Sequence, residues 1–113
     1  MRIEAYDFGT ITVDGRTFTS DLKIVGGRVL PGWWRKEGHR LLPEDIEDIL
    51  RAAPDVLVVG TGHEGLMRVS REVEERLAQA HIRLIARPTR EACKEFNSLP
   101  SEEDTAFAAH LTC

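Results

Sequence analysis

The stretch that decides the fold runs from residue 56 to residue 65 and reads Val56-Leu57-Val58-Val59-Gly60-Thr61-Gly62-His63-Glu64-Gly65. Its first half is a continuous apolar run, which is typical of a β-strand covered on both faces. Its second half has the spacing G-x-G-x-x-G, which in a longer chain indicates a dinucleotide-binding loop. The stretch therefore raises one question: whether the chain binds a nucleotide, or whether a buried strand needs a glycine-rich turn at its end.

Two features around the loop argue against a dinucleotide. In a dinucleotide fold a helix begins almost directly after the loop, so that its N-terminal N–H groups meet the pyrophosphate. Here residues 66–69 intervene before Ser70, the expected N-cap of the next helix. The following strand ends at Arg87, where an acidic residue would be needed to hold the ribose hydroxyls. We therefore expect no dinucleotide and no other cofactor.

The segments after the loop complete a βαβ unit. The helix that begins after Ser70 carries an apolar stripe, and residues 82–86 have the pattern of a strand. Strand, helix and strand at this spacing predict that residues 55–60 and 82–86 form parallel strands. The stripe consists of Val73, Leu77 and Ala80.

The first third of the chain predicts antiparallel β structure. Asp14-Gly15 separates two alternating runs, which is the strongest short signal for a hairpin, and Gly26-Gly27 marks a second break. The pattern therefore predicts an N-terminal β-meander of three strands. The runs behind this prediction are residues 11–13, 16–19, 22–25 and 28–30.

Two further helices and an ambiguous tail complete the chain. Residues 43–53 predict a helix between Pro43 and Pro54, with Ile46, Ile49, Leu50 and Ala53 on one face. Thr89 is expected to cap a third helix, which turns Ala92, Cys93 and Phe96 inward. Residues 105–111 fit a strand or a helix, and a strand is favoured because only a short connection leads into it.

Length and charge restrict the class of protein. A chain of 113 residues allows one domain, residues 1–113, and its net charge of −4 comes without any polybasic run. No apolar segment approaches the length of a membrane span, and the N-terminus lacks the pattern of a signal peptide. We therefore expect a cytoplasmic protein without a nucleic-acid or membrane partner.

The glycine-rich loop remains a candidate for a small ligand. Open α/β sheets bind ligands at the carboxyl ends of their parallel strands. A small anion could meet backbone N–H groups and two side chains there, or the loop could be a tight turn with polar residues facing solvent. The candidate ligand-binding residues are Gly60, Thr61, Gly62, His63 and Arg87.

A second candidate surface is the segment from Trp33 to His39. Adjacent tryptophans in an extended chain point to opposite faces, so one is expected in the core and the other partly exposed. Trp and Arg are enriched in interaction hot spots, although a packed Trp with a stacked Arg explains the pattern equally simply. The candidate partner-binding residues are Trp33, Trp34, Arg35 and His39.

The histidines and cysteines show no paired metal-binding spacing. His110-x-x-Cys113 is a lone half-site at the chain end, where fraying works against a fixed geometry, so we expect no metal. Cys93 lies on an apolar helix face, whereas Cys113 is the better candidate for a reactive thiol. No residue stands out as catalytic.

Several short motifs, taken together, resemble a family of small uncharacterised domains that includes the adipogenesis-associated domain protein and the mitochondrial complex I (NADH dehydrogenase) assembly factor 3. The resemblance implies an α/β domain with a mixed central sheet flanked by helices, an extra antiparallel hairpin and an antiparallel last strand. It implies no catalytic residue, and it favours a non-enzymatic protein-interaction or assembly-accessory module over the alternative, a small-ligand or anion-binding protein. The matching stretches are Phe8-Gly9-x-Ile11-x-Val13-Asp14-Gly15, Asp21-Leu22, Trp33-Trp34-Arg35, Gly38-His39, Val58-Val59-Gly60-Thr61-Gly62, Thr89-x-x-Ala92, Phe96-Asn97-x-Leu99 and His110-Leu111-Thr112-Cys113.

Overall fold

A five-stranded mixed sheet forms the centre of the computed structural model, which describes residues 1–113. The order of its strands is β5-β4-β10-β7-β9. β10 lies in the middle, parallel to β7 and antiparallel to β4, and β9 is parallel to β7. The bounds are β4 Leu22–Val25, β5 Arg28–Pro31, β7 Val56–Thr61, β9 Arg83–Arg87 and β10 Thr105–His110. The parallel pair expected from the βαβ spacing is confirmed, and so is the strand in the tail.

The N-terminal meander is present, and it contains the two strands expected at 11–13 and 16–19 together with one strand that was not expected, at residues 3–7. It consists of β1 Ile3–Asp7, β2 Thr10–Val13 and β3 Arg16–Phe18, which form a separate antiparallel sheet. The expected strands at 22–25 and 28–30 belong instead to the central sheet. The reason is that β4 pairs with β10, a partner from the other end of the sequence that no local pattern reveals. The Asp14-Gly15 hairpin is confirmed, with φ values of 48° and 81° at its two turn residues.

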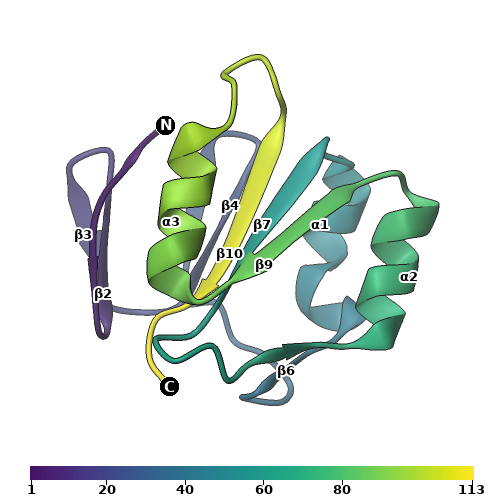
Figure 1. Ribbon diagram of the computed structural model, residues 1–113, viewed down its shortest axis with the longest axis horizontal. Coiled ribbons are helices and arrows are strands. Elements are labelled where there is room, and N and C mark those ends of the chain that lie inside the picture. The colour runs from purple at the N-terminus through teal and green to yellow at the C-terminus, as the bar shows by residue number, and fades with distance from the viewer.

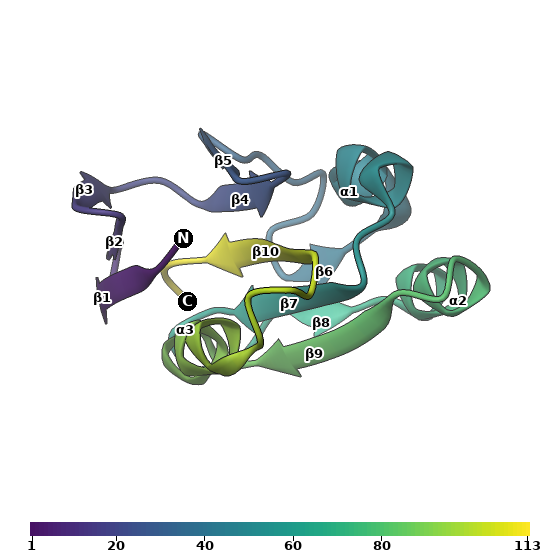
Figure 2. The same cartoon turned by 90° about the horizontal axis from the view of Figure 1, so that it is seen from above.

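Two apolar clusters cover the two faces of the central sheet. β10 contributes side chains to both, because its successive residues point to opposite faces. Phe107 and Ala109 face the cluster formed with the small sheet and α3 Thr89–Ser98, whereas Ala106 and Ala108 face the cluster formed with the other helices. Figure 2 shows α3 and the small sheet on one side of the strands and α1 and α2 on the other. Those helices are α1 Glu47–Ala52, preceded by the 3-10 turn η1 Pro43–Ile46, and α2 Arg71–Gln79. None of the helices is both long and apolar enough to cross a membrane.

The helix starts show where local signals hold and where they fail. Ser70 caps α2 as expected, because its side-chain oxygen accepts a hydrogen bond from the N–H of Val73. Thr89 was expected to cap α3, but that prediction is wrong, because Pro88 occupies the N-cap position. The Thr89 hydroxyl instead donates to the carbonyl of His110 and accepts from the N–H of Gly62, so it ties α3 to the ends of β10 and β7.

A short parallel pair joins two segments beside the sheet. β6 Arg40–Leu41 pairs with β8 Arg68–Val69, and the N–H of Arg68 also donates to the carbonyl of His39. This pairing brings the segment after Trp33 next to the exit of the glycine-rich loop. Figure 1 shows both segments near the C-terminal end of β10.

Candidate functional site

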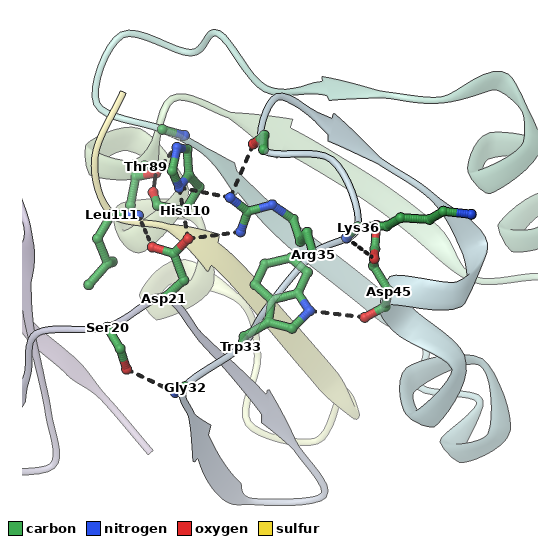
Figure 3. Close-up of polar contacts among 12 residues, drawn as sticks. Ser20, Asp21, Gly32, Trp33, Arg35, Lys36, Asp45, Thr89, His110 and Leu111 are labelled. Carbon is green, nitrogen blue, oxygen red and sulfur yellow. Dashed lines mark hydrogen bonds and ion pairs between the residues drawn. The ribbon is translucent and has the colours of Figure 1, made fainter.

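The candidate site lies where β7 and β10 end and β4 begins. Because β4 runs antiparallel to β10, its first residues lie beside the last residues of β10. The polar residues that gather there are Asp21, just before β4, Arg35 from the loop after β5, and His110 at the end of β10 (Figure 3). This edge of the sheet is the place where open α/β sheets bind ligands.

The Asp21 carboxylate is the centre of this group and accepts hydrogen bonds from three donors. Its Oδ2 lies 2.8 Å from Nη1 of Arg35 and 2.8 Å from Nδ1 of His110, and its Oδ1 accepts the N–H of Leu111 at 2.7 Å. Burial by itself would raise the pKa of Asp21, but the hydrogen bonds from His110, Leu111 and Arg35 outweigh burial and hold the pKa below its ordinary value of 3.8. The carboxylate is therefore ionised at neutral pH.

Arg35 is a buried cation whose contacts fix the loop after β5. Besides the ion pair with Asp21, its Nη2 donates to the carbonyl of Gly38 at 3.1 Å. Its guanidinium carbon lies 4.9 Å from the centre of the Trp33 ring, and Nε1 of Trp33 donates to the carbonyl of Asp45 at 3.0 Å. This arrangement is the packed Trp with a stacked Arg, the alternative that the sequence left open to a partner-binding surface.

The hydrogen bonding of His110 determines which of its ring nitrogens is free. Nδ1 of His110 makes two contacts, of which the one to Asp21 is the shorter; since an ionised Asp21 can only accept, we assign the Nδ1 proton to that hydrogen bond. Nη2 of Arg35 also lies 3.0 Å from Nδ1, a contact between two donors that Asp21 and the Gly38 carbonyl keep in place. Nε2 is buried and has no hydrogen-bond partner. The lone pair of Nε2 is consequently available to an incoming group.

Backbone N–H groups of the glycine-rich loop already have hydrogen-bond acceptors within the chain. The N–H groups of Gly62, His63 and Gly65 donate to the Thr89 hydroxyl, the Thr112 carbonyl and the Gly62 carbonyl respectively. A Cβ on Gly60 would lie 2.9 Å from the Thr89 hydroxyl oxygen and 3.2 Å from the Cβ of Ala109. The first glycine is therefore needed because α3 and β10 pack directly against the end of β7.

The five candidate ligand-binding residues are only partly brought together. Gly60, Thr61, Gly62 and His63 lie at the end of β7, and His63 packs edge to face on Phe8 with ring centres 5.4 Å apart. Arg87 is exposed, its Nε lies 3.7 Å from Glu95 on α3, and its Nη1 donates to the carbonyl of Ala86. These contacts direct the Arg87 guanidinium along β9 and α3.

The candidate partner residues divide between core and surface. Trp33 and Arg35 are buried, whereas the side chain of Trp34 is 82% exposed and His39 is exposed. One buried and one exposed tryptophan is the arrangement expected from the sequence. His39 also lies against His110, with ring centres 6.2 Å apart.

A pocket of about 480 Å³ adjoins this surface at the start of α2. We call it the arginine-rich pocket. It is lined by Glu37, His39, Arg40, Leu66, Arg68, Val69, Ser70, Arg71 and Glu72. Arg40 forms ion pairs with Glu37 and Glu72, whereas Arg68 and Arg71 form none. The pocket joins the segment after Trp33 to the exit of the glycine-rich loop.

Sequence reasoning did not assign a role to the pair Asp21 and His110. The two residues are 89 positions apart, so no spacing pattern connects them. The only signal was that Asp21-Leu22 and His110-Leu111 both belong to the motifs that carry the family resemblance. Cys93 is buried as expected, and burial raises the pKa of its thiol to about 12, which makes it a poor nucleophile.

Comparison with solved structures finds the same fold over the whole chain. A conserved hypothetical protein from Pyrococcus horikoshii OT3 is 31% identical, with all of both chains aligned and a TM-score of 0.85. The protein MT938 is 27% identical over 99% of this chain and 98% of its own, with a TM-score of 0.82. An Mth938-like domain from Bordetella pertussis is 22% identical over 97% of this chain and 85% of its own, with a TM-score of 0.67.

The family model for a protein of unknown function, DUF498/DUF598, matches residues 3–111. The match spans all the strands and all three α-helices, including Asp21, Arg35 and His110. It confirms the resemblance to a family of small uncharacterised domains. The chain therefore belongs to the DUF498/DUF598 family.

Proposed function

We propose that the chain is a non-enzymatic protein-interaction module that binds its partner through residues 32–39 and the arginine-rich pocket. The observation that carries this proposal is Trp34, the most exposed of the large apolar side chains, at 82%. Tryptophan is strongly enriched among the residues that dominate binding energy in protein interfaces. A large aromatic ring left in water therefore marks a surface that a partner would cover.

The backbone around Trp34 is held from both sides, which favours binding. Trp33 is anchored by its hydrogen bond to the Asp45 carbonyl, and Arg35 is anchored by Asp21 and the Gly38 carbonyl. Because neighbouring residues of an extended segment point to opposite sides, burying both neighbours of Trp34 directs its ring outward. A side chain presented on a fixed backbone loses less conformational entropy when a partner binds.

The polar groups near Trp34 support a binding role rather than a catalytic one. Asp21 and Arg35 use their charges to hold β4, β10 and the loop after β5 together. The nearby cations that form no ion pair are Arg68 and Arg71, which line the arginine-rich pocket. The partner segment that fits this surface combines an apolar side chain for Trp34 with acidic groups for the two arginines.

Capture from a native lysate tests the proposal. The immobilised chain, the variant Trp34→Ala and the control Lys94→Ala, a surface change on α3, are compared by quantitative mass spectrometry. We expect proteins captured by the wild type and by Lys94→Ala to be lost with Trp34→Ala. With the purified partner, the loss should be about 2 kcal/mol or more, which is roughly thirtyfold in Kd. Equal capture and equal Kd for Trp34→Ala would refute the proposal.

The arginine-rich pocket supports a second candidate function, the binding of a small anionic ligand. Arg71 is the first residue of α2, where the helix dipole adds to its attraction for an anion, and Arg68 lines the same pocket from β8. A thermal-shift screen of phosphates, nucleotides and carboxylates tests it, since a ligand at 100 times its Kd adds about 2.7 kcal/mol of stability. We expect a shift that Arg71→Ala abolishes, and no shift with any compound at millimolar concentration would exclude this candidate.

A further inference from the structure

Three side chains with metal-ligand chemistry meet at the C-terminal end of β10. His39 comes from the loop after β5, and His110 and Cys113 come from the end of β10 and the residues that follow it. Their ligand atoms all lie within 4.8 Å of one another. In a tetrahedral zinc site with metal–ligand bonds of about 2.0–2.3 Å, ligand atoms are roughly 3.3–3.7 Å apart. His39 and Cys113 are exposed, so small side-chain rotations close this difference.

His110 already has the hydrogen bonding that metal-bound histidines show. Such a histidine almost always donates its second ring N–H to a carboxylate, which fixes the tautomer and the direction of the free nitrogen. Nδ1 of His110 donates to Asp21 at 2.8 Å, and the side chain of His110 is only 10% exposed. Nε2 is buried and has no partner in the protein. A buried lone pair without a partner costs free energy, and a metal ion would relieve that cost.

The segment that carries Cys113 is anchored, contrary to the fraying that the sequence suggested. Leu111 donates its N–H to Asp21, and its carbonyl accepts from the N–H of Gly9 and from the hydroxyl of Tyr6. The carbonyl of Thr112 accepts from the N–H of His63 at 2.7 Å. These bonds hold the backbone up to the residue before Cys113.

Gly62 leaves room for this segment because it has no side chain. A Cβ on Gly62 would lie 2.9 Å from the carbonyl oxygen of Thr112, 3.0 Å from that of Cys113 and 3.1 Å from Cδ2 of His110. Cδ2 is the ring carbon bonded to Nε2, so this edge of the His110 ring lies next to Gly62, and so does the carbonyl of Cys113. The φ of Gly62 is +107°, which also favours glycine.

The two charged groups on the Nδ1 side of His110 neutralise each other. The carboxylate of Asp21 and the guanidinium of Arg35 form an ion pair at 2.8 Å on the Nδ1 side of His110, away from Nε2. The cation nearest to His110 is therefore neutralised by Asp21, whereas the unpaired Arg68 and Arg71 lie on the His39 side, in the arginine-rich pocket. Two imidazoles and one thiolate form a ligand set that suits zinc and its neighbours among the transition metals.

From these contacts we propose that His39, His110 and Cys113 bind a divalent transition-metal ion of the zinc type. Three ligands from this chain leave the fourth position to water or to a group that approaches from solvent. The proposal goes beyond the interaction module, because it assigns a ligand to residues whose chemistry does not depend on Trp34.

Titration with Co²⁺ tests the site directly. The full chain is reduced, stripped with chelator and titrated without oxygen, and absorption is recorded in the visible and near-ultraviolet range. We expect the intense visible bands of four-coordinate cobalt, together with a thiolate-to-cobalt charge-transfer band, and we expect Zn²⁺ to remove both by competition. Absence of these bands with equimolar cobalt would overturn the proposal.

Variants of exposed residues identify the ligands without unfolding the chain. Cys113→Ala should abolish the charge-transfer band and His39→Ala should weaken cobalt binding, while circular dichroism stays that of the wild type. The matched controls are Cys93→Ala for the thiol and His81→Asn for the imidazole, where asparagine suits the φ of +58°. Both controls should keep the wild-type cobalt spectrum. An unchanged spectrum in Cys113→Ala or His39→Ala would overturn the proposal.

A variant of Asp21, which orients His110, and a variant of the exposed Trp34 separate the metal site from other roles. Asp21→Asn should weaken Zn²⁺ binding by about 10–100-fold, because the hydrogen bond that directs His110 loses its charge. Trp34→Ala should leave the cobalt spectrum and the Zn²⁺ affinity unchanged, even if it abolishes partner capture. Failure of the metal site and failure of the interaction surface are therefore distinguishable.

Discussion

Replacing Asp21 tests whether its carboxylate holds the end of the sheet together. Asp21→Ala leaves the buried guanidinium of Arg35 without a counter-charge and the N–H of Leu111 without its acceptor. Removing one partner of a buried ion pair destabilises proteins by about 3–5 kcal/mol, so we expect a loss of that size. Asp21→Asn keeps one acceptor oxygen but no charge, so it should lower the free energy of unfolding by less than Asp21→Ala does.

Urea denaturation at neutral pH, followed by tryptophan fluorescence, measures the loss. Asp48→Ala is the matched control, because Asp48 contacts Lys23 at the same distance of 2.8 Å but its side chain is 31% exposed, against 18% for Asp21. The Lys23–Asp48 pair is less deeply buried than Arg35–Asp21, and Lys23 keeps the carbonyl of Asp45 as an acceptor, so the control should destabilise the chain clearly less than Asp21→Ala. An Asp21→Ala variant that loses no more stability than Asp48→Ala would refute the reasoning.

The pH dependence of stability supplies a second readout for Asp21. Its pKa is lowered in the folded state, so the folded chain binds this proton more weakly than the unfolded chain does. The resulting stabilisation is complete above the ordinary value of 3.8 and is lost as the pH falls through the lower folded pKa. The difference in stability between wild type and Asp21→Asn should therefore be constant near neutral pH and shrink in acid below that value.

Three further predictions concern other parts of the chain. Gly62→Ala should cost about 1–3 kcal/mol in urea denaturation, whereas Gly15→Ala, which has positive φ but open space around it, should cost less. Cys93, whose pKa burial raises to about 12, is about one part in ten thousand thiolate at pH 8, so iodoacetamide should label it only after urea unfolds the chain. Trp33→Ala should lose about 3–5 kcal/mol, because its ring is buried, and Trp34→Ala should change stability by less than about 0.5 kcal/mol. The labelling of Cys93 is measured by mass spectrometry. For the tryptophans, equal losses of stability in the two variants would contradict the prediction.

Features encoded within a few residues were predictable from the sequence. The cap at Ser70 and the hairpin turn at Asp14-Gly15 depend on contacts between near neighbours, and their hydrogen bonds and backbone angles are set by residue types that lie side by side in the chain. The same is true of the alternation of Trp33 and Trp34 between core and surface. The βαβ unit around β7 joins more distant residues, but the succession of strand, helix and strand along the sequence predicts its parallel pairing.

Features that depend on register between distant strands were not predictable. Thr89 looked like a helix cap, but its hydroxyl bonds to Gly62 and His110, which only the packing of β7, α3 and β10 brings near. The cluster around Asp21 depends on the pairing of β4 with β10. The glycine-rich loop was correctly placed at the end of a buried strand, but the segments that pack closely against its glycines come from distant parts of the chain.

The position of β10 also governs the order in which the molecule can assemble. β4 and β7 are made before β10, yet one edge of each strand pairs with β10, and the two strands do not pair with each other. During synthesis, the edges of both strands therefore stay open until residues 105–110 have emerged from the ribosome, and contacts of this long range form slowly. We expect that a chain released before residue 105 will expose two unpaired strand edges and aggregate, and that a separate peptide carrying β10 will rescue it by insertion between them.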